Sequence, residues 1–118
     1  MLHNVNKIAS ILNDQKVKTS IVDIFQIKPL NKKKLKEIIF NKTAVVTVEE
    51  QHIDGGIGSQ LCEIIAEEGI NIPIKRFGIK DKYSQFYGDR NWLQKFYEID
   101  PDTVSKKILT WIRKNYSK

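Results

Sequence analysis

The chain is poor in the residues that build covalent or metal-based scaffolds. Only one of its 118 residues, Cys62, is a cysteine, so an internal disulfide is impossible, and one thiol cannot supply a zinc site by itself. No apolar run approaches the ~20 residues needed to cross a bilayer. Residues 1–15 lack the basic and continuous apolar stretches of a signal peptide. These absences predict a single domain, residues 1–118, in a reducing cytoplasm with no membrane partner.

Arginine is also scarce, although the chain is basic. Lys and Arg total 20 against 14 Asp and Glu, giving a formal charge of +6, and only three of the 20 are arginines. A basic surface can bind the phosphates of nucleic acid, but base-edge and bidentate phosphate contacts favour arginine. The lysine cluster at residues 32–42 is typical of a solvated helix face. A small basic nucleic-acid-binding module is therefore an alternative function, not the favoured one.

The apolar spacing predicts helices alternating with strands. Apolar residues at helical spacing predict a helix over residues 3–14, and further helices are expected after Asn31, around residues 57–68, around Trp92 and after Asp100. Strands are expected over residues 19–27, 43–48 and 72–79. This order predicts an α/β fold, three-layer α/β/α, with a mostly parallel sheet.

A glycine-rich segment follows the predicted strand at 43–48. Its glycines are Gly55, Gly56 and Gly58, and they stand where a strand gives way to a helix. Backbone amides at such a place can hold a phosphate, but the spacing matches neither of the common phosphate-binding patterns. Nearby carboxylates would also repel an anion. A tight turn that needs positive φ or close backbone approach is the favoured interpretation.

Titratable side chains beside this turn suggest an alternative of another class. Glu49, Glu50 or His52 could serve as acid or base in a free-standing hydrolase. Adjacent strand residues point to opposite faces, however, so Glu49 and Glu50 do not converge as a pair. No serine or cysteine stands at a spacing that completes a triad.

Aromatic residues gather between positions 83 and 97. Six of them fall within these 15 residues: Tyr83, Phe86, Tyr87, Trp92, Phe96 and Tyr97. Tyr and Trp are enriched at subunit contacts. Two interpretations stay open: the rings form such a contact, or they cover the edge of the sheet.

The segment VVTVEEQHIDGGIGSQLCEIIAEEG resembles the C-terminal domain of transketolase-like thiamine-diphosphate enzymes. The strand, the Glu49-Glu50 pair, the turn from Gly55 to Ser59 and the next helix match that family in order. The resemblance continues through SIVDIFQIKPLNKKKL and IKRFGIKDKYSQFYGDRNWLQKFYEIDPDTVSKKI, so nearly the whole chain is covered. It looks nearest to the small subunit of split bacterial transketolases. It is also similar to 1-deoxyxylulose-5-phosphate synthase and to the beta subunit of 2-oxo acid dehydrogenases.

This resemblance implies a noncatalytic domain of an enzyme that transfers ketol groups between sugar phosphates. Thiamine diphosphate and magnesium would be held by other domains or by another subunit, and none by this chain alone. The implied partners are those domains and a second copy in a homodimer. The resemblance also implies that the family's first, central strand is missing here. A truncated chain and a misplaced start are the favoured explanations, and a strand supplied by another chain is the third.

The expected task of this domain is assembly and domain packing. We expect Gly55, Gly56 and Gly58 to let the turn approach a neighbouring backbone. Glu49 and Glu50 are expected to bond to that turn or to the partner copy. His52 and Ser59 belong to the same family motif, without an assigned role. No catalytic, cofactor-binding or metal-binding residue is predicted.

Overall fold

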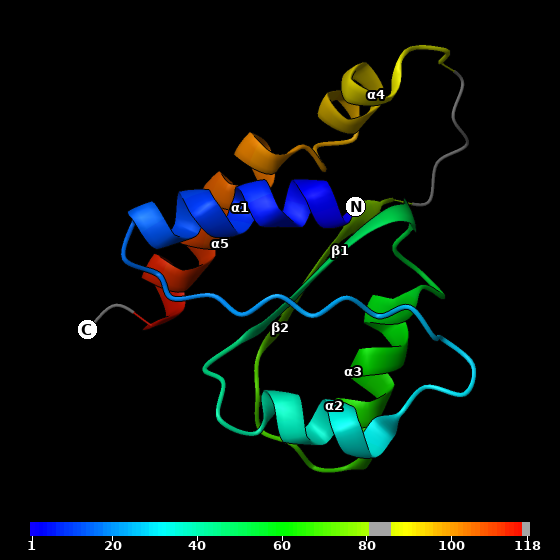
Figure 1. Ribbon diagram of the computed structural model, residues 1–118, viewed down its shortest axis with the longest axis vertical. Helices are drawn as coiled ribbons and strands as arrows, with labels where there is room; N and C mark the ends of the chain where they lie inside the picture. Colours follow the sequence, from blue (N-terminus) through cyan, green and yellow to red (C-terminus); the bar gives the residue numbers. More distant parts are fainter. Residues whose placement is uncertain (81–85, 117–118) are drawn as a thin grey trace. The chain divides into compact units, whose positions relative to one another are not determined.

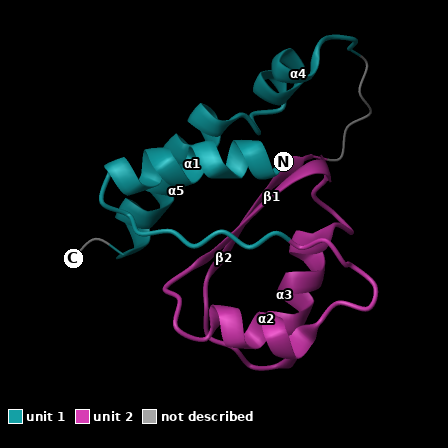
Figure 2. Ribbon diagram, in the orientation of Figure 1, with its two compact units in different colours: residues 1–23, 83–118 teal, residues 24–82 magenta. Residues whose placement is uncertain are grey.

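The computed structural model describes residues 1–80 and 86–116, and seven regular elements lie among them (Figure 1). In chain order these are α1 (Leu2–Asp14), α2 (Lys32–Ile39), β1 (Val45–His52), α3 (Ile57–Glu67), β2 (Ile74–Ile79), α4 (Arg90–Phe96) and α5 (Pro101–Tyr116). The chain divides into two compact units. Residues 24–82 form one unit, and residues 1–23 with 83–118 form the other (Figure 2).

The unit of residues 24–82 contains a parallel strand pair. β1 runs parallel to β2 with Val45 opposite Ile74 and Val48 opposite Phe77. The amide of Val45 donates to the carbonyl of Pro73 at 2.9 Å, and an irregularity in the register precedes His52. Two parallel strands need a long connection, which α3 provides. The predicted mixture of helices with parallel strands is therefore confirmed.

The predicted strand over residues 19–27 is wrong. These residues have no ladder partner among the described residues, and the sheet there consists of β1 and β2 only. A β-branched, apolar segment has only a contextual preference for strand, because the ladder hydrogen bonds must come from a neighbour. Phe25, in the middle of this segment, is 92% exposed. The three-layer arrangement stays a prediction.

The strand predicted at 43–48 lies in β1, but β1 continues to His52. Thus Glu49, Glu50 and His52 are strand residues and do not belong to the following turn. The extension depends on β2, since the amide of Ile53 still donates to the carbonyl of Ile79 at 2.8 Å.

Two apolar clusters hold the helices of this unit against the strands. Leu35 of α2 packs with Leu61 and Ile64 of α3, and Ile24, Leu30 and Ile74 surround them. The second cluster contains Ile39, Ile65 and Ile72, with Val45 and Ile74 against them. Because Ile74 joins both clusters, α2 and α3 are fixed to the sheet along their length. This rigid support positions the strand-to-helix turn described below.

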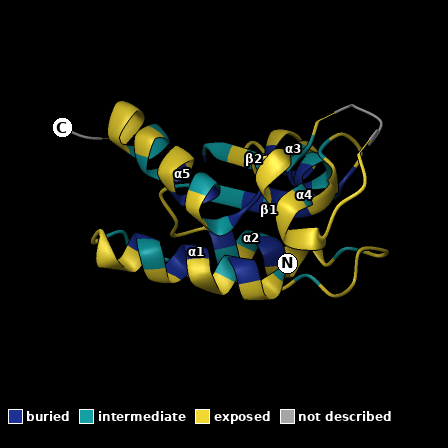
Figure 3. Ribbon diagram, turned by 90° about the horizontal axis from the view of Figure 1, so that it is seen from above, coloured by how far each residue is buried: buried dark blue, intermediate teal, exposed yellow. Residues whose placement is uncertain are grey.

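In the other unit α1 packs against α5. Buried Ile8, Ala9 and Leu12 lie along one side of α1, and Figure 3 shows buried and exposed residues alternating around this helix. Val104 and Ile108 are the buried counterparts on α5. The amide nitrogen of Asn4 donates to Gln94 at 2.8 Å within this apolar surround, so α1 is also tied to α4.

Local end signals that the sequence predicts are confirmed at three helices. The side chain of Asn31 accepts from the amide of Lys34 at 2.9 Å and begins α2. Asp100 accepts from the amide of Thr103 at 3.1 Å and begins α5. Beyond the end of α3, Gly69 has a φ of +61°, in the left-handed region that glycine adopts without strain.

Candidate functional site

The carboxylate of Glu49 closes the amino end of α3. One of its oxygens accepts from the amide of Ile57 and the other from the amide of Gly58, both at 2.8 Å. The side chain of Gln51 donates to the first oxygen at 3.1 Å. Glu49 is 5% exposed, so these charge-assisted hydrogen bonds form away from bulk water. We call this arrangement the Glu49 cap.

Two glycines make room for the Glu49 cap. A Cβ atom on Gly56 would lie 2.1 Å from one carboxylate oxygen of Glu49. A Cβ atom on Gly58 would lie 2.7 Å from the other oxygen and 2.6 Å from Oγ1 of Thr47. Gly56 has an extended φ of −82°, so its requirement is space and not a special backbone conformation. Gly55 is the reverse case, with a φ of +78° and open space around it.

A second network closes the turn itself, residues 53–59, which we call the glycine turn. The hydroxyl of Ser59 donates to the carbonyl of Ile53 and accepts from the amide of Gly55, each at 3.1 Å. Arg76 of β2 donates to the same hydroxyl at 2.9 Å and to the carbonyl of Ile53 at 3.1 Å. A hydroxyl has one donor and two acceptor positions, so Ser59 is fully bonded. The turn is thereby fastened to both strands.

The residues predicted around this site separate into two groups. Glu49, Gly55, Gly56, Gly58 and Ser59 meet in the cap and the turn. Glu50 and His52 lie exposed on β1. Since both oxygens of Glu49 already accept hydrogen bonds from helix amides, this carboxylate is not placed as a general base. The hydrolase hypothesis therefore loses its buried candidate.

Sequence reasoning assigned no role here to Arg76 and Gln51. Arg76 is one of only three arginines in a lysine-rich chain. An arginine on the strand beside β1 is the pattern that could have pointed to it, because a guanidinium can serve two acceptors at once. Gln51 shares a strand face with Glu49, two residues away, and that period-2 relation could have pointed to their contact.

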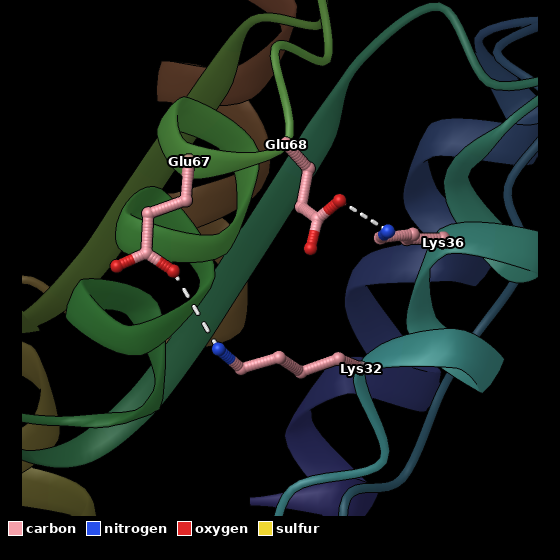
Figure 4. Close-up of polar contacts among 4 residues, drawn as sticks. All are labelled: Lys32, Lys36, Glu67 and Glu68. Atoms are coloured by element: carbon pink, nitrogen blue, oxygen red, sulfur yellow. Dashed lines mark hydrogen bonds and ion pairs between the residues drawn. The ribbon is translucent and has the colours of Figure 1, made fainter.

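The lysine cluster of α2 contacts α3. The ammonium of Lys32 lies 3.5 Å from a carboxylate oxygen of Glu67, and Lys36 pairs with Glu68 (Figure 4). These side chains are largely exposed, so each pair contributes about 0–1 kcal/mol to stability. Two of the clustered lysines therefore have acidic partners within the same unit.

The predicted aromatic cluster is a packed stack on and before α4, with Tyr83 outside the described residues. The rings of Trp92 and Phe96 stack at a centroid distance of 5.4 Å and an interplanar angle of 13°. Phe86 lies 4.9 Å from Phe96 and 6.3 Å from Trp92. Tyr97 meets Phe96 edge-on at 5.1 Å.

Comparison with known proteins gives this arrangement a family context. Residues 1–104 match the family described as the transketolase C-terminal domain. The chain belongs to that family. The putative transketolase C-terminal section of Methanocaldococcus jannaschii is 34% identical over 104 residues, covering 88% of this chain and 32% of that protein. One subunit of the apulose-4-phosphate transketolase of Actinobacillus succinogenes is 36% identical over 93 residues, covering 79% and 30%.

A solved structure supports the same assignment. A split-gene transketolase, an inactive β4 tetramer, superposes with a TM-score of 0.81 at 26% identity, covering 92% of this chain and 35% of that one. Relatives also include 1-deoxy-D-xylulose-5-phosphate synthases, and both groups of homologues were expected from the resemblance. The chain spans about a third or less of the length of these relatives.

The transketolase family implies a parent enzyme that depends on thiamine diphosphate, and the glycine turn is the place in this chain where a diphosphate could be held. The amides that would face a diphosphate there already donate to Glu49. A diphosphate at that position would also meet a buried carboxylate, and like charges repel. The glycine turn does not fit the cofactor.

Metal-binding and membrane-spanning features are both missing from the part of the chain that the structure describes. Within residues 1–80 and 86–116, no three His, Cys, Asp or Glu side chains stand together as a possible metal site. Among the same residues, none of the helices combines the length and the apolar character needed to span a membrane.

Proposed function

We propose that this chain is the noncatalytic assembly domain of a thiamine-diphosphate enzyme of the transketolase type. The observation that carries the proposal is the Glu49 cap, since the amides best placed to bind an anionic cofactor are used to hold the fold together. In the parent enzyme, ketol transfer between sugar phosphates takes place on other domains or on another subunit. This chain supplies a rigid packing surface to that assembly.

The proposed partners follow from the coverage of the relatives. One of them is a single subunit of a transketolase, and another is described as a β4 tetramer. We propose that this chain likewise pairs with the remaining domains or with a companion subunit that holds thiamine diphosphate and magnesium, and that the assembly contains at least two copies of it. Assembly within the cytoplasm is part of the same proposal.

Two other parents remain alternatives within the family. The C-terminal domain of 1-deoxyxylulose-5-phosphate synthase is one, and that of a 2-oxo acid dehydrogenase beta subunit is the other. Both retain the noncatalytic role of this domain, and they differ in the substrate of the parent enzyme. A panel of sugar phosphates and 2-oxo acids offered to the assembled enzyme separates them.

The assembly role is tested with the purified 118-residue chain, thiamine diphosphate and magnesium. We expect no ketol transfer by the chain alone and no heat of cofactor binding in calorimetry. Addition of a companion chain that carries the diphosphate- and pyrimidine-binding domains is expected to give turnover. Ketol transfer or tight cofactor binding by the isolated chain would contradict the proposal.

A further inference from the structure

The aromatic stack of α4 leaves an apolar surface uncovered. Phe86 is 51% exposed, Trp92 45% and Phe96 48%, and Tyr87 beside them is fully exposed. We call these four residues the aromatic face. The rings are already ordered by their mutual contacts, and Trp92 also lies against Gly88, where a Cβ atom would approach its ring to 2.6 Å. Binding a partner would therefore cost little additional ordering of side chains.

The size of the aromatic face is close to what a specific dimer needs. Aromatic side chains bury roughly 150–250 Å² each, so the exposed fractions correspond to on the order of 500 Å² per copy. Two such faces in contact would cover on the order of 1,000 Å², which is about the lower limit for a specific interface. A two-fold axis brings the same face of both copies together, so no second surface is required.

The charges of α4 are complementary when two copies run antiparallel. Asp89, at the amino end, caps the helix through the amide of Trp92, and Lys95 lies in the last turn. Positions 89, 92, 95 and 96 share one side of the helix, as residues three and four apart do. Neither Asp89 nor Lys95 has an ion-pair partner among the described residues. Antiparallel pairing would place each lysine opposite the other copy's aspartate.

We propose that two copies of this chain associate through the aromatic face of α4, around a two-fold axis. The proposal rests on the assembly role proposed above and names the surface that performs it. Trp92 and Phe96 form the centre of the contact, because large rings that lose water carry most of the binding energy in an interface. Two reciprocal contacts between Asp89 and Lys95 set the antiparallel orientation.

Sedimentation equilibrium of the full chain tests the proposal over protein concentrations of roughly 1–100 µM, the range that corresponds to moderate association energies. We expect a monomer–dimer equilibrium in this range. Trp92→Lys and Tyr87→Lys are each expected to raise the dissociation constant about tenfold or more, as for central interface residues. The Tyr87 side chain is fully exposed and takes no part in the ring stack, so its variant keeps the test valid if Trp92→Lys disturbs α4.

Phe40→Lys is the matched control. Phe40 is 81% exposed but belongs to the other compact unit, at the end of α2. The same substitution there is expected to change the dissociation constant less than about twofold, which is the ordinary range for a surface residue. Lys95→Glu should weaken the dimer, since it places two carboxylates opposite each other. In a Trp111→Phe background, emission from Trp92 should shift to shorter wavelength as the dimer forms.

The outcomes separate this surface from the assembly role itself. A chain that stays monomeric at the highest concentration overturns the proposed surface, while assembly with a companion subunit is measured by its own assay. A dimer that is insensitive to Trp92→Lys and Tyr87→Lys also overturns it, and leaves the assembly role in place. Variants that weaken only binding to a companion subunit would assign the aromatic face to that subunit and overturn pairing between copies.

Discussion

At the scale of single residues, the carboxylate of Glu49 joins β1 to α3. We expect Glu49→Gln to lower the free energy of unfolding by about 1.5–3 kcal/mol, because an amide cannot accept at both positions and its NH₂ group would face a helix N–H. The midpoint of urea unfolding measures this loss. Glu63→Gln, on the exposed side of α3, is the control and should change stability by about 0.5 kcal/mol or less. Equal effects of the two variants would contradict the role of the cap.

The glycines of the turn give a second prediction at this scale. Gly56→Ala should lower stability by about 2–3 kcal/mol, because its Cβ atom would displace the Glu49 carboxylate and remove a cap. Gly55→Asn should cost far less, since Gly55 has open space and asparagine tolerates positive φ. Thermal unfolding of the two variants side by side makes the comparison. A larger loss in Gly55→Asn would show that backbone conformation, not space, governs the turn.

Asp100 gives the chain a pH dependence. Burial by itself raises the pKa of this carboxyl, but hydrogen bonds from Thr103 and from the backbone amides of Asp100 and Asp102 outweigh burial and lower the pKa below its ordinary value. A lowered folded-state pKa means that the carboxylate stabilises the fold above the unfolded-state pKa of about 3.9. That stability is lost as pH falls through the lower, folded-state value.

The variant Asp100→Asn isolates this effect, because asparagine also caps helices. Urea unfolding at a series of pH values is expected to show the largest deficit of the variant at neutral pH. The deficit should shrink as pH falls below about 4, where the native carboxyl takes up its proton. A deficit independent of pH would mean that the charge of Asp100 contributes nothing.

At the scale of secondary structure elements, β1 has a ladder partner on one side only among the described residues. The Val45 amide points to β2, and residues of a parallel strand alternate in the side to which they bond. The amides of Val46 and Val48 therefore point away from β2. In hydrogen exchange on the isolated chain we expect them to exchange faster than those of Val45 and Thr47. If the missing strand is supplied within the parent enzyme, the difference should disappear there.

The same element shows what sequence could and could not predict. The caps at Asn31 and Asp100 could be predicted, because the donor and acceptor lie within four residues of each other. The wrong strand at 19–27 and the short estimate of β1 both concern ladders, whose partners are far along the chain. The Glu49 cap has the same difficulty, since its acceptor and the amide of Gly58 are nine residues apart and meet only through the turn. Family resemblance supplied the fold class that local patterns left open.

At the scale of the whole molecule, the net charge of +6 keeps the nucleic-acid alternative in view. Lysines 32 and 36 contact glutamates of the same unit, which reduces the positive potential of the strongest basic cluster. We expect binding to a single strand of about 30 nucleotides to be weaker than the roughly 10⁻⁴–10⁻⁶ M typical of non-specific binding at physiological salt. Fluorescence anisotropy between about 50 and 200 mM salt measures this. Tight binding that falls steeply with salt would restore the alternative.

The connection of Arg76 to the glycine turn has a consequence for how the unit of residues 24–82 forms. Arg76 reaches Ser59 and Ile53 only after β2 has paired with β1, and β2 follows α3 along the chain. The bend that starts the helix is thus completed by a residue synthesised after the helix has ended. A growing polypeptide released before position 76 would leave this bend without its final fastening.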